Sequence, residues 1–428
     1  MPDVEAWRPL VVLVPVLVAG GLWVAVPDTR RRSAATLALL WNLVGLTAVN
    51  ALALHAGWWS FGGDVPAVCG VPVDLLLAWA VLWSLIPVLA ERWVPVGYTV
   101  TGLLLCDVYG MTRLRPMVDL AGDWWWGELV AAMTCLLPGI VLAVLTVRRR
   151  HLWIRVVLQV VLFTGVLFGA IPVIAFTAAA HGPSWTAGHD VHVSGVLDVI
   201  AIQVGGVVAL IALAAVIEFA RAGGTPWPWD PPAQVVTTGP YAYVANPMQL
   251  CGVVLIALTA AVLSSPMLLV AALVAAAFSA GLAAWVEDTA LSERCGESWT
   301  AYRSTVHDWL PRLRPSPAIA PARVYLARGC DPCSDLAAWI TDRSPVALQI
   351  CAAEDHREPL RRIRYEQDSP SYRLDGIRAV GAVMTHLNLA WAVVGWVISA
   401  PVIARVLQLL VDASGGGPRD PRTATASN

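Results

Sequence analysis

The sequence has no lysine, and charged side chains make up only 14% of its 428 residues. Soluble proteins average about 25% charged residues, so this composition excludes an ordinary soluble domain. Without a lysine amine, the chain can neither form a Schiff base nor build a Walker-type phosphate loop. The net charge is −2 and no basic stripe lies outside short loops, which argues against nucleic acid as a partner.

Long apolar runs are abundant instead. Hydrophobic residues make up 57% of the chain, and its mean hydropathy is +0.66. Runs long enough to cross a hydrocarbon core of ~30 Å occupy residues 9–26, 34–56, 74–90, 95–109, 128–147, 152–178, 193–219, 248–265 and 267–286. They predict an all-α polytopic membrane protein with about nine transmembrane helices. The first run has an acidic approach and no cleavage site after it, so we expect a span and not a removed signal peptide.

Arginine placement predicts the orientation of the runs. Arginine clusters follow the first, third, fifth and seventh runs: Arg30-Arg31-Arg32, Arg92, Arg148-Arg149-Arg150 and Arg221. Positive residues favour the cytoplasmic side. We therefore expect a cell (inner) membrane protein with its N-terminus outside and the turn at 223–247 inside.

A compact polar turn lies between the seventh and eighth runs. It reads Thr237-Thr238-Gly239-Pro240-Tyr241-Ala242-Tyr243-Val244-Ala245-Asn246-Pro247. Gly239-Pro240 cannot continue a helix, because proline lacks an amide hydrogen and disfavours helical geometry in the residue before it. Pro247 suits the first turn of the next helix. The turn thus holds two tyrosines and an amide where membrane helices meet water.

A second polar segment closes the ninth run. Glu287 and Asp288 end the apolar stretch, and a spaced set of residues follows: Leu291, Gly296, Trp299, Tyr302 and Pro311. Carboxylates at the end of a membrane helix are costly unless they serve a site. Runs eight and nine form a hairpin, so both polar segments are expected on the same face of the membrane.

Together the two segments resemble the isoprenylcysteine carboxyl methyltransferase and phospholipid methyltransferase family of integral-membrane enzymes. Its motifs read roughly G-P-Y-x-Y-x-R-H/N-P-x-Y, then E-E-x-x-L, F-G-x-x-Y-x-x-Y and a closing W/F-x-P. The matching residues are Gly239, Pro240, Tyr241, Tyr243, Asn246, Pro247, Glu287, Leu291, Gly296, Tyr302 and Pro311. The resemblance covers roughly residues 220–315. Ala245 stands in place of the family's arginine, Gln249 of its tyrosine and Asp288 of its second glutamate.

The resemblance implies a methyltransferase that uses S-adenosylmethionine and acts on a lipophilic acceptor, an isoprenoid or a lipid. Methyl transfer is an in-line displacement, so positioning and exclusion of water supply most of the acceleration. On this basis the catalytic residues are Asn246 and Glu287, and no metal ion is expected. The cofactor pocket comprises Gly239, Tyr241, Tyr243, Asn246, Pro247, Glu287, Asp288 and Tyr302.

The residue types assign roles within this pocket. The carboxylates of Glu287 and Asp288 can hold the ammonium group of the cofactor or offset its sulfonium charge. Asn246 and backbone donors near Gly239 can bind its carboxylate and ribose, and one of the two tyrosines of the turn can stack on adenine. The acceptor would enter from the lipid between runs eight and nine.

A plainer interpretation remains open for each of these residues. Tyrosine and tryptophan anchor helices at membrane interfaces, and Glu287 can be a solvated charge at a helix end. Ala245 also removes the fixed fork of donors that arginine offers to an anion. Either the acceptor is not anionic, or catalysis has been lost and the scaffold remains.

Beyond Pro311 the composition changes. Residues 323–327 read as a strand, Cys330-Asp331-Pro332-Cys333 as a turn, 335–341 as a helix and 346–352 as a second strand. A Cys-x-x-Cys between strand and helix is typical of thioredoxin-like redox domains. The segment also resembles the DCC family of predicted thiol–disulfide oxidoreductases, although Ala327 replaces the family's aspartate.

This resemblance implies a small cytosolic α/β domain. Cys330 is the attacking thiol at a helix N-terminus, where the helix dipole stabilises a thiolate, and it meets a thiol redox partner. Cys333 resolves the mixed disulfide. The alternatives are an inert pair or a zinc site with Cys351 and His356, whose spacing matches no common finger.

The predicted organisation has five parts. Residues 1–222 form a seven-helix transmembrane region, and 223–315 carry the methyltransferase-like motifs and a transmembrane hairpin. Residues 316–322 are a linker, 323–414 the thioredoxin-like domain, and 415–428 a disordered tail. Within the fourth part, polar residues interrupt the apolar stretches 377–393 and 399–411, so a packed or surface-lying pair of amphipathic helices is favoured over a tenth span.

Two other functions stay open. In the first, the chain is a membrane-anchored thiol–disulfide oxidoreductase with a catalytically inactive methyltransferase-like scaffold. In the second, the N-terminal runs transport or bind a lipid, with Asp74 or Asp198 on the path. These runs show no internal repeat, which ranks transport last.

Overall fold

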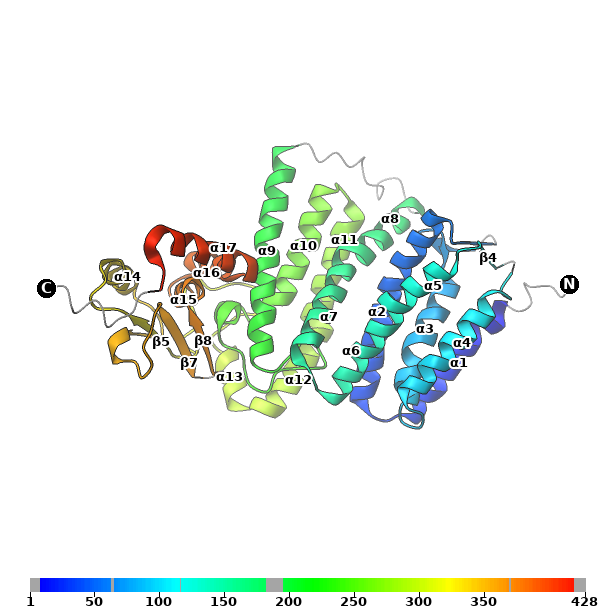
Figure 1. The fold of residues 1–428 in the computed structure, drawn as a ribbon, viewed down its shortest axis with the longest axis horizontal. Helices are drawn as coiled ribbons and strands as arrows, with labels where there is room; N and C mark the ends of the chain where they lie inside the picture. Colours follow the sequence, from blue (N-terminus) through cyan, green and yellow to red (C-terminus); the bar gives the residue numbers. More distant parts are fainter. Residues whose placement is uncertain (1–7, 63–64, 116, 182–194, 369–370, 419–428) are drawn as a thin grey trace. The chain divides into compact units, whose positions relative to one another are not determined.

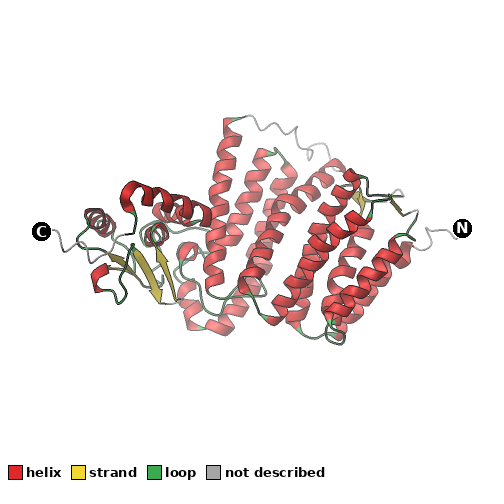
Figure 2. Cartoon of the chain, viewed as in Figure 1, coloured by secondary structure: helices red, strands yellow, loops and turns green. Residues whose placement is uncertain are grey.

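The computed structural model describes the chain except for residues 1–7, 63–64, 116, 182–194, 369–370 and 419–428. Helices dominate the described part (Figures 1 and 2). By its internal contacts the chain divides into two compact units. The first comprises residues 1–188 with 266–268, and the second comprises residues 189–265 with 269–428.

The first unit is a bundle of apolar helices. In chain order they are α1 (Arg8–Ala25), α2 (Thr29–Ala56), α3 (Val73–Ala90), α4 (Val96–Met111), α5 (Trp125–Ala131), α6 (Leu137–Arg148), α7 (Leu152–Gly165) and α8 (Ile171–His181). π-Helical turns η2 (Ala132–Leu136) and η3 (Val166–Ala170) join α5 to α6 and α7 to α8. Short strands β1 (Trp59–Phe61) and β4 (Val118–Leu120) pair antiparallel, as do β2 (Ala67–Val68) and β3 (Val71–Pro72).

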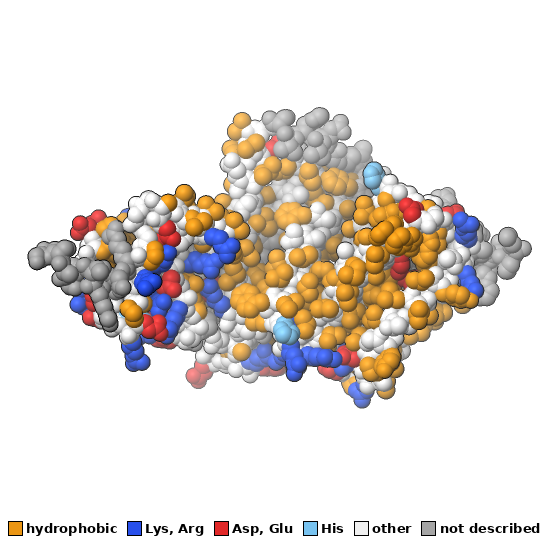
Figure 3. Space-filling view, in the orientation of Figure 1, with side chains coloured by type: hydrophobic (Ala, Val, Ile, Leu, Met, Phe, Trp, Pro, Cys, Tyr) orange, Lys and Arg blue, Asp and Glu red, His pale blue; other side chains and the backbone are white. Residues whose placement is uncertain are grey.

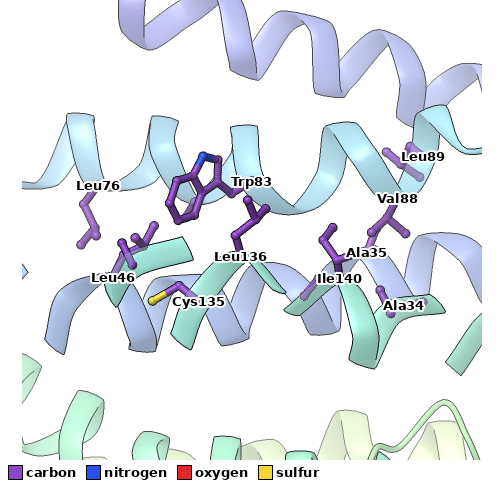
Figure 4. Packing of buried hydrophobic residues seen from close by; sticks show 14 of the residues in the cluster. Ala34, Ala35, Leu46, Leu76, Trp83, Val88, Leu89, Cys135, Leu136 and Ile140 are labelled. Atoms are coloured by element: carbon purple, nitrogen blue, oxygen red, sulfur yellow. The ribbon is translucent and has the colours of Figure 1, made fainter. Parts of the chain in front are cut away.

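Local sequence sets the ends of α2, the helix at the centre of this bundle. The Asp28 carboxylate accepts a 3.0 Å hydrogen bond from the Arg30 amide at its start, and Gly57 closes it in the left-handed conformation. Its inner face packs on α3 and α6. Figure 4 shows Leu46 of α2, Trp83 of α3 and Leu136 of η2 meeting in this buried core.

The second unit begins with the membrane-type helices α9 (Val196–Arg221), α10 (Pro247–Val262) and, from residue 269 onward, α11 (Pro266–Phe278). A 3₁₀ turn, η5 (Gly239–Ala242), precedes α10. A π-helical turn, η6 (Ser279–Ala283), joins α11 to α12 (Ala284–Cys295), and α13 (Glu297–Arg303) follows. α9 packs along α10, and η5 contacts α9.

A four-stranded sheet forms the core of the C-terminal part. Its strands are β5 (Ala322–Leu326), β6 (Leu348–Ala352), β7 (Arg364–Asp368) and β8 (Ser371–Asp375), in the order β6-β5-β7-β8. β5 is parallel to β6 and antiparallel to β7, with Val324 opposite Ile350 and Tyr365. The helices here are α14 (Asp331–Thr341), α15 (Ile377–Met384), α16 (Leu389–Ser399) and α17 (Pro401–Val411), with 3₁₀ turn η7 (Ala353–Asp355) and π-helical turn η8 (Asp412–Gly416).

The chain is a polytopic, mostly helical membrane protein. Seven helical segments of the described part are long and apolar enough to cross a membrane. In the described residues each of the nine predicted apolar runs is mostly helical, but α4 and α10 have only 16 residues each, so the predicted number of nine spans is not established. On the face shown in Figure 3, hydrophobic side chains lie over much of the helical part, and charged side chains gather around β7 and β8 and along the lower edge.

Several predicted boundaries differ from the structure. α9 belongs with the motif region and not with the helices before it, because it packs on α10 and α16. The predicted linker is packed: Ser316 and Ile319 are buried, and the Ser316 amide donates to the Ala242 carbonyl. β7 and β8 were not predicted, and 377–393 is two helices. η8 extends into the predicted tail, whose residues 419–428 lie outside the described part.

Candidate functional site

The 3₁₀ turn η5 and Thr238 before it, here called the Gly239 corner, contact the C-terminal end of α9. Gly239 has a φ of 57°, and a Cβ built on it would lie 2.6 Å from Cγ of Glu218. The Thr238 hydroxyl donates a 2.6 Å hydrogen bond to Glu218 Oε2, and Arg221 forms an ion pair with the other oxygen of that carboxylate. Glycine is required here by both the backbone angle and the close approach.

The structure brings the two polar segments together. The Tyr302 hydroxyl donates a 2.8 Å hydrogen bond to the carbonyl of Tyr241, and the Asn246 side chain donates a 3.2 Å bond to Asp308 Oδ1. The Ala245 amide donates to the His307 carbonyl at 2.9 Å. Residues about sixty positions apart in the sequence therefore share one site, next to the start of α10, where Asn246 is the N-cap and Pro247 the first residue.

Glu287 and Asp288 do not end the ninth helix, contrary to the sequence interpretation. The helix continues to Cys295, and Gly296, with a φ of 45°, turns the chain into α13. The Trp299 indole N–H donates a 2.8 Å hydrogen bond to Asp288 Oδ1, which ties α13 back onto α12. The exposed Asp288 thus contributes to this turn of the chain.

Buried phenol and amide groups give the site its polarity. The Tyr241 hydroxyl and Gln249 Oε1 are buried, and among the described residues neither has a hydrogen-bond partner. Burial, and then the nearby Glu287 carboxylate, raise the pKa of both Tyr241 and Tyr302 above the ordinary value. Both phenols are therefore neutral hydrogen-bonding groups near one carboxylate. A buried polar atom without a partner is unfavourable unless a ligand supplies one.

Tyr243 lies apart from this cluster. Its hydroxyl donates a 3.1 Å hydrogen bond to the carbonyl of Thr385, and its ring packs edge-on against Trp396 of α16. Tyr241, by contrast, stacks on Phe219 of α9. The two tyrosines of the turn thus face different neighbours, and Tyr243 fastens the motif to the C-terminal part.

Three residues that sequence reasoning did not select belong to this site: Glu218, Arg303 and Asp308. Arg303 forms an ion pair with Asp308, the acceptor of the Asn246 bond, and its guanidinium lies over the Trp299 ring. The sequence held a weak signal for Arg303 and Asp308, because each is next to a motif residue. Arg303 follows Tyr302, and Asp308 precedes Trp309, the first residue of the closing W-x-P.

The position of the family's arginine is filled differently. Ala245 is buried in a hydrophobic cluster with Leu291, Trp299 and Tyr302. The cationic side chain linked to Asn246 is instead that of Arg303. It forms an ion pair with Asp308, which accepts the hydrogen bond from Asn246. The substitution at 245 therefore coincides with a locally packed apolar cluster.

The Cys-x-x-Cys motif lies at the start of α14, directly after β5. Cys330 is the N-cap residue, in an extended conformation, and both cysteines are partly exposed. The amide of Cys333 donates a 2.9 Å hydrogen bond to the Cys330 carbonyl. The neighbouring Arg328 pairs with Asp355 at 2.7 Å. The predicted strand, turn and helix are present in this order.

Comparison with known proteins connects one part of the chain to a family. Residues 194–298 match the family model of phospholipid methyltransferase. This range contains α9, the Gly239 corner, α10, α11 and α12. No curated protein and no solved structure matches the chain.

Proposed function

We propose that the chain is an integral-membrane methyltransferase that transfers a methyl group from S-adenosylmethionine to a lipophilic acceptor. The observation that carries this proposal is the meeting of the two motif segments through Tyr302, Tyr241, Asn246 and Asp308. The match of residues 194–298 to the phospholipid methyltransferase family supports the reaction class.

The polar groups present fit such a cofactor. S-Adenosylmethionine offers cationic groups, hydroxyls and an adenine, and it supplies an activated methyl group when bound. The Tyr241 hydroxyl and Gln249 Oε1 are the buried groups that still need partners, and Glu287 is the carboxylate close to both phenols. The Glu287 carboxylate would bind a positively charged group of the cofactor, while Tyr241 and Gln249 would form hydrogen bonds with its hydroxyl or amino groups.

Other residues of the site hold these groups in place. Asn246 is oriented by Asp308, which Arg303 holds, and the corner at Gly239 is fixed by Glu218. Preorganised groups of this kind lower the cost of positioning two reactants. Tyr302 acts as a positioning residue, because its hydroxyl is committed to the Tyr241 carbonyl.

The lipid environment of the helices favours a lipophilic acceptor. Leu269, Leu273 and Trp285 project from α11 and α12 with more than half of their surface exposed. On a membrane helix such a surface faces acyl chains. An acceptor with an apolar tail, whether isoprenoid or lipid, would reach the site along it. We further propose an inner-membrane location with the site on the cytoplasmic side, as the arginine pattern predicts.

The test is cofactor binding and labelled-methyl transfer by the purified full-length protein. S-Adenosylmethionine should bind in calorimetry, and label should enter a membrane lipid extract. Glu287→Gln and Asn246→Ala should each lower binding by at least about tenfold, which corresponds to ~1.4 kcal/mol. Glu293→Gln, an exposed carboxylate on the same helix, is the matched control. Failure of the unaltered protein to bind the cofactor would refute the proposal.

A second candidate function rests on the C-terminal part. There β5 is parallel to β6 and Cys330 is the N-cap residue of the intervening α14, and a Cys-x-x-Cys between a strand and a helix supports a redox role. We propose that Cys330 and Cys333 form a thiol–disulfide redox pair, either beside methyl transfer or, if the methyltransferase-like portion is inactive, in its place. A defined reduction potential that disappears in Cys330→Ser would support it.

A further inference from the structure

α17 presents its apolar side outward. Val402, Val406, Leu409 and Leu410 are 75%, 51%, 63% and 60% exposed. Their spacing of four, three and one residues places them along one helical face, and the exposed Arg405 lies among them. A helix on the surface of a soluble domain shows the opposite pattern, with its apolar stripe turned toward the core.

The polar side of α17 faces the protein. Gln408 Oε1 accepts a 2.9 Å hydrogen bond from the Ile377 amide, and Gln408 Nε2 donates a 2.8 Å bond to Asp412. Arg362 binds both oxygens of Asp412, one at 2.9 Å. Ala404, one turn before Gln408, is buried. These bonds fix the rotation of α17 about its own axis, and so they hold its apolar face outward.

The preceding helix connects α17 to a membrane-type helix. Ala392 and Trp396 of α16 share a hydrophobic cluster with Ile211 and Ala214 of α9. These two α9 residues lie seven to ten positions before Arg221, or about 10 to 15 Å along the helix. α16 therefore packs on the apolar length of α9 and not on its polar end.

The chain then bends sharply. α16 and the α17–η8 segment meet at an angle of 86° around Pro401. Figure 1 shows α9 running from top to bottom and α17 lying across that direction. An apolar helix that continued along α9 would be a span; one that turns aside lies along the membrane.

We propose that α17 lies in the plane of the membrane, with its outward face in the lipid at the boundary between acyl chains and headgroups. Val402, Val406, Leu409 and Leu410 enter the acyl region. The Arg405 guanidinium extends to the lipid phosphates, as arginine side chains do at interfaces. Continuity with α9 through α16 favours lipid over a second copy of the chain as the occupant of this face. This inference does not depend on the proposed methyl transfer.

The experiment places a small fluorescent amino acid at position 409 of the full chain, reconstituted in phosphatidylcholine–phosphatidylglycerol vesicles. Position 273, exposed on α11, serves as the lipid control, and position 354, exposed on η7, as the water control. Brominated acyl chains and aqueous iodide are the two quenchers. We expect position 409 to match 273, with bromolipid quenching several-fold above that at 354 and protection from iodide.

Two results would overturn the inference. If iodide quenches position 409 as strongly as 354, the face is in water. If neither quencher reaches position 409, a protein partner such as a second copy covers it. A further variant, Arg405→Gln, tests the headgroup contact. It should leave the unfolding temperature unchanged and weaken the dependence of bromolipid quenching at 409 on the phosphatidylglycerol content.

Discussion

The Tyr302 hydroxyl lies 2.8 Å from the carbonyl oxygen of Tyr241 and donates a hydrogen bond to it. Through this bond α13 holds the 3₁₀ turn that begins at Gly239. The two tyrosines have opposite requirements: the hydroxyl of Tyr302 is satisfied within the protein, whereas that of Tyr241 is buried without a partner in the described part of the chain. One phenol stabilises the fold, and under the proposed function the other bonds the cofactor.

The first prediction follows from this asymmetry. Tyr302→Phe leaves the buried Tyr241 carbonyl without its donor and should lower the free energy of unfolding by ~1–3 kcal/mol. Tyr241→Phe removes an unpartnered buried hydroxyl, so the unfolding temperature should stay the same or rise, while cofactor affinity falls. Thermal unfolding in detergent and calorimetry measure the two effects. Equal destabilisation by both variants would show that Tyr241 has a protein partner.

The second prediction concerns the Gly239 corner. Gly239→Ala adds a methyl group 2.6 Å from Cγ of Glu218 at a positive φ. Gly223→Ala is the matched control, because Gly223 also has a positive φ, of 86°, but nothing lies within 4 Å of its added carbon. The control should cost about 1–2 kcal/mol for the backbone alone. Gly239→Ala should cost measurably more in thermal unfolding, and a matching cost would remove the steric argument.

Much of the helical architecture could be predicted because lipid leaves so few alternatives. A backbone in the hydrocarbon core must satisfy its own hydrogen bonds, so a long apolar run is a helix. The prolines were predicted only in part: Pro247 does begin α10, but Gly239-Pro240 begins the 3₁₀ turn η5, and α9 ends much earlier, at Arg221. The strand before Cys330 and the helix after it were also found within a few residues.

What the sequence concealed depends on contacts between distant segments. The end of the ninth helix was placed too early, because Glu287 and Asp288 read as a polar terminus, although α13 folds back and Trp299 pairs with Asp288. Tyr243 was grouped with Tyr241 by spacing, yet its hydroxyl reaches Thr385, 142 positions away.

The strands β7 and β8 were not predicted for a different reason. β7 and β8 are rich in charged residues, which form ion pairs such as that of Arg364 with Asp375 at 2.8 Å. These residues obscure the alternation of apolar and polar side chains that marks a strand in a sequence. They are defined by their pairing, of β7 with β5 and of β8 with β7.

The third prediction tests the dithiol. Cys330 is the N-cap residue of α14, outside the helix itself, whereas Cys333 lies within the first turn of the helix. We expect a pulse of alkylating reagent on the reduced protein to modify Cys330 first, and Cys330→Ser to abolish formation of the internal disulfide under mild oxidation. Cys351→Ser, which alters a partly exposed cysteine on β6, should leave both unchanged. If Cys351→Ser has the larger effect, the redox pair has been assigned to the wrong residues.

The fourth prediction is a pH dependence of stability that comes from His386. This residue is buried; its Nδ1 lies 2.7 Å from the Val346 carbonyl, and the Tyr365 hydroxyl lies 2.9 Å from Nε2. A carbonyl can only accept, so Nδ1 carries the hydrogen of a neutral ring. Burial lowers the pKa of His386 from 6.5 to about 4.

The His386 ring is therefore protonated near pH 6.5 in the unfolded chain but only near pH 4 in the folded protein. In that window the unfolded state binds more protons, so stability falls as the pH falls, by up to about 3 kcal/mol. Unfolding temperatures measured from pH 7.5 to 4.5 should show this slope. His386→Asn cannot titrate there, so whatever its stability at pH 7.5, its decline on acidification should be shallower. An unchanged slope would assign the acid sensitivity to other groups.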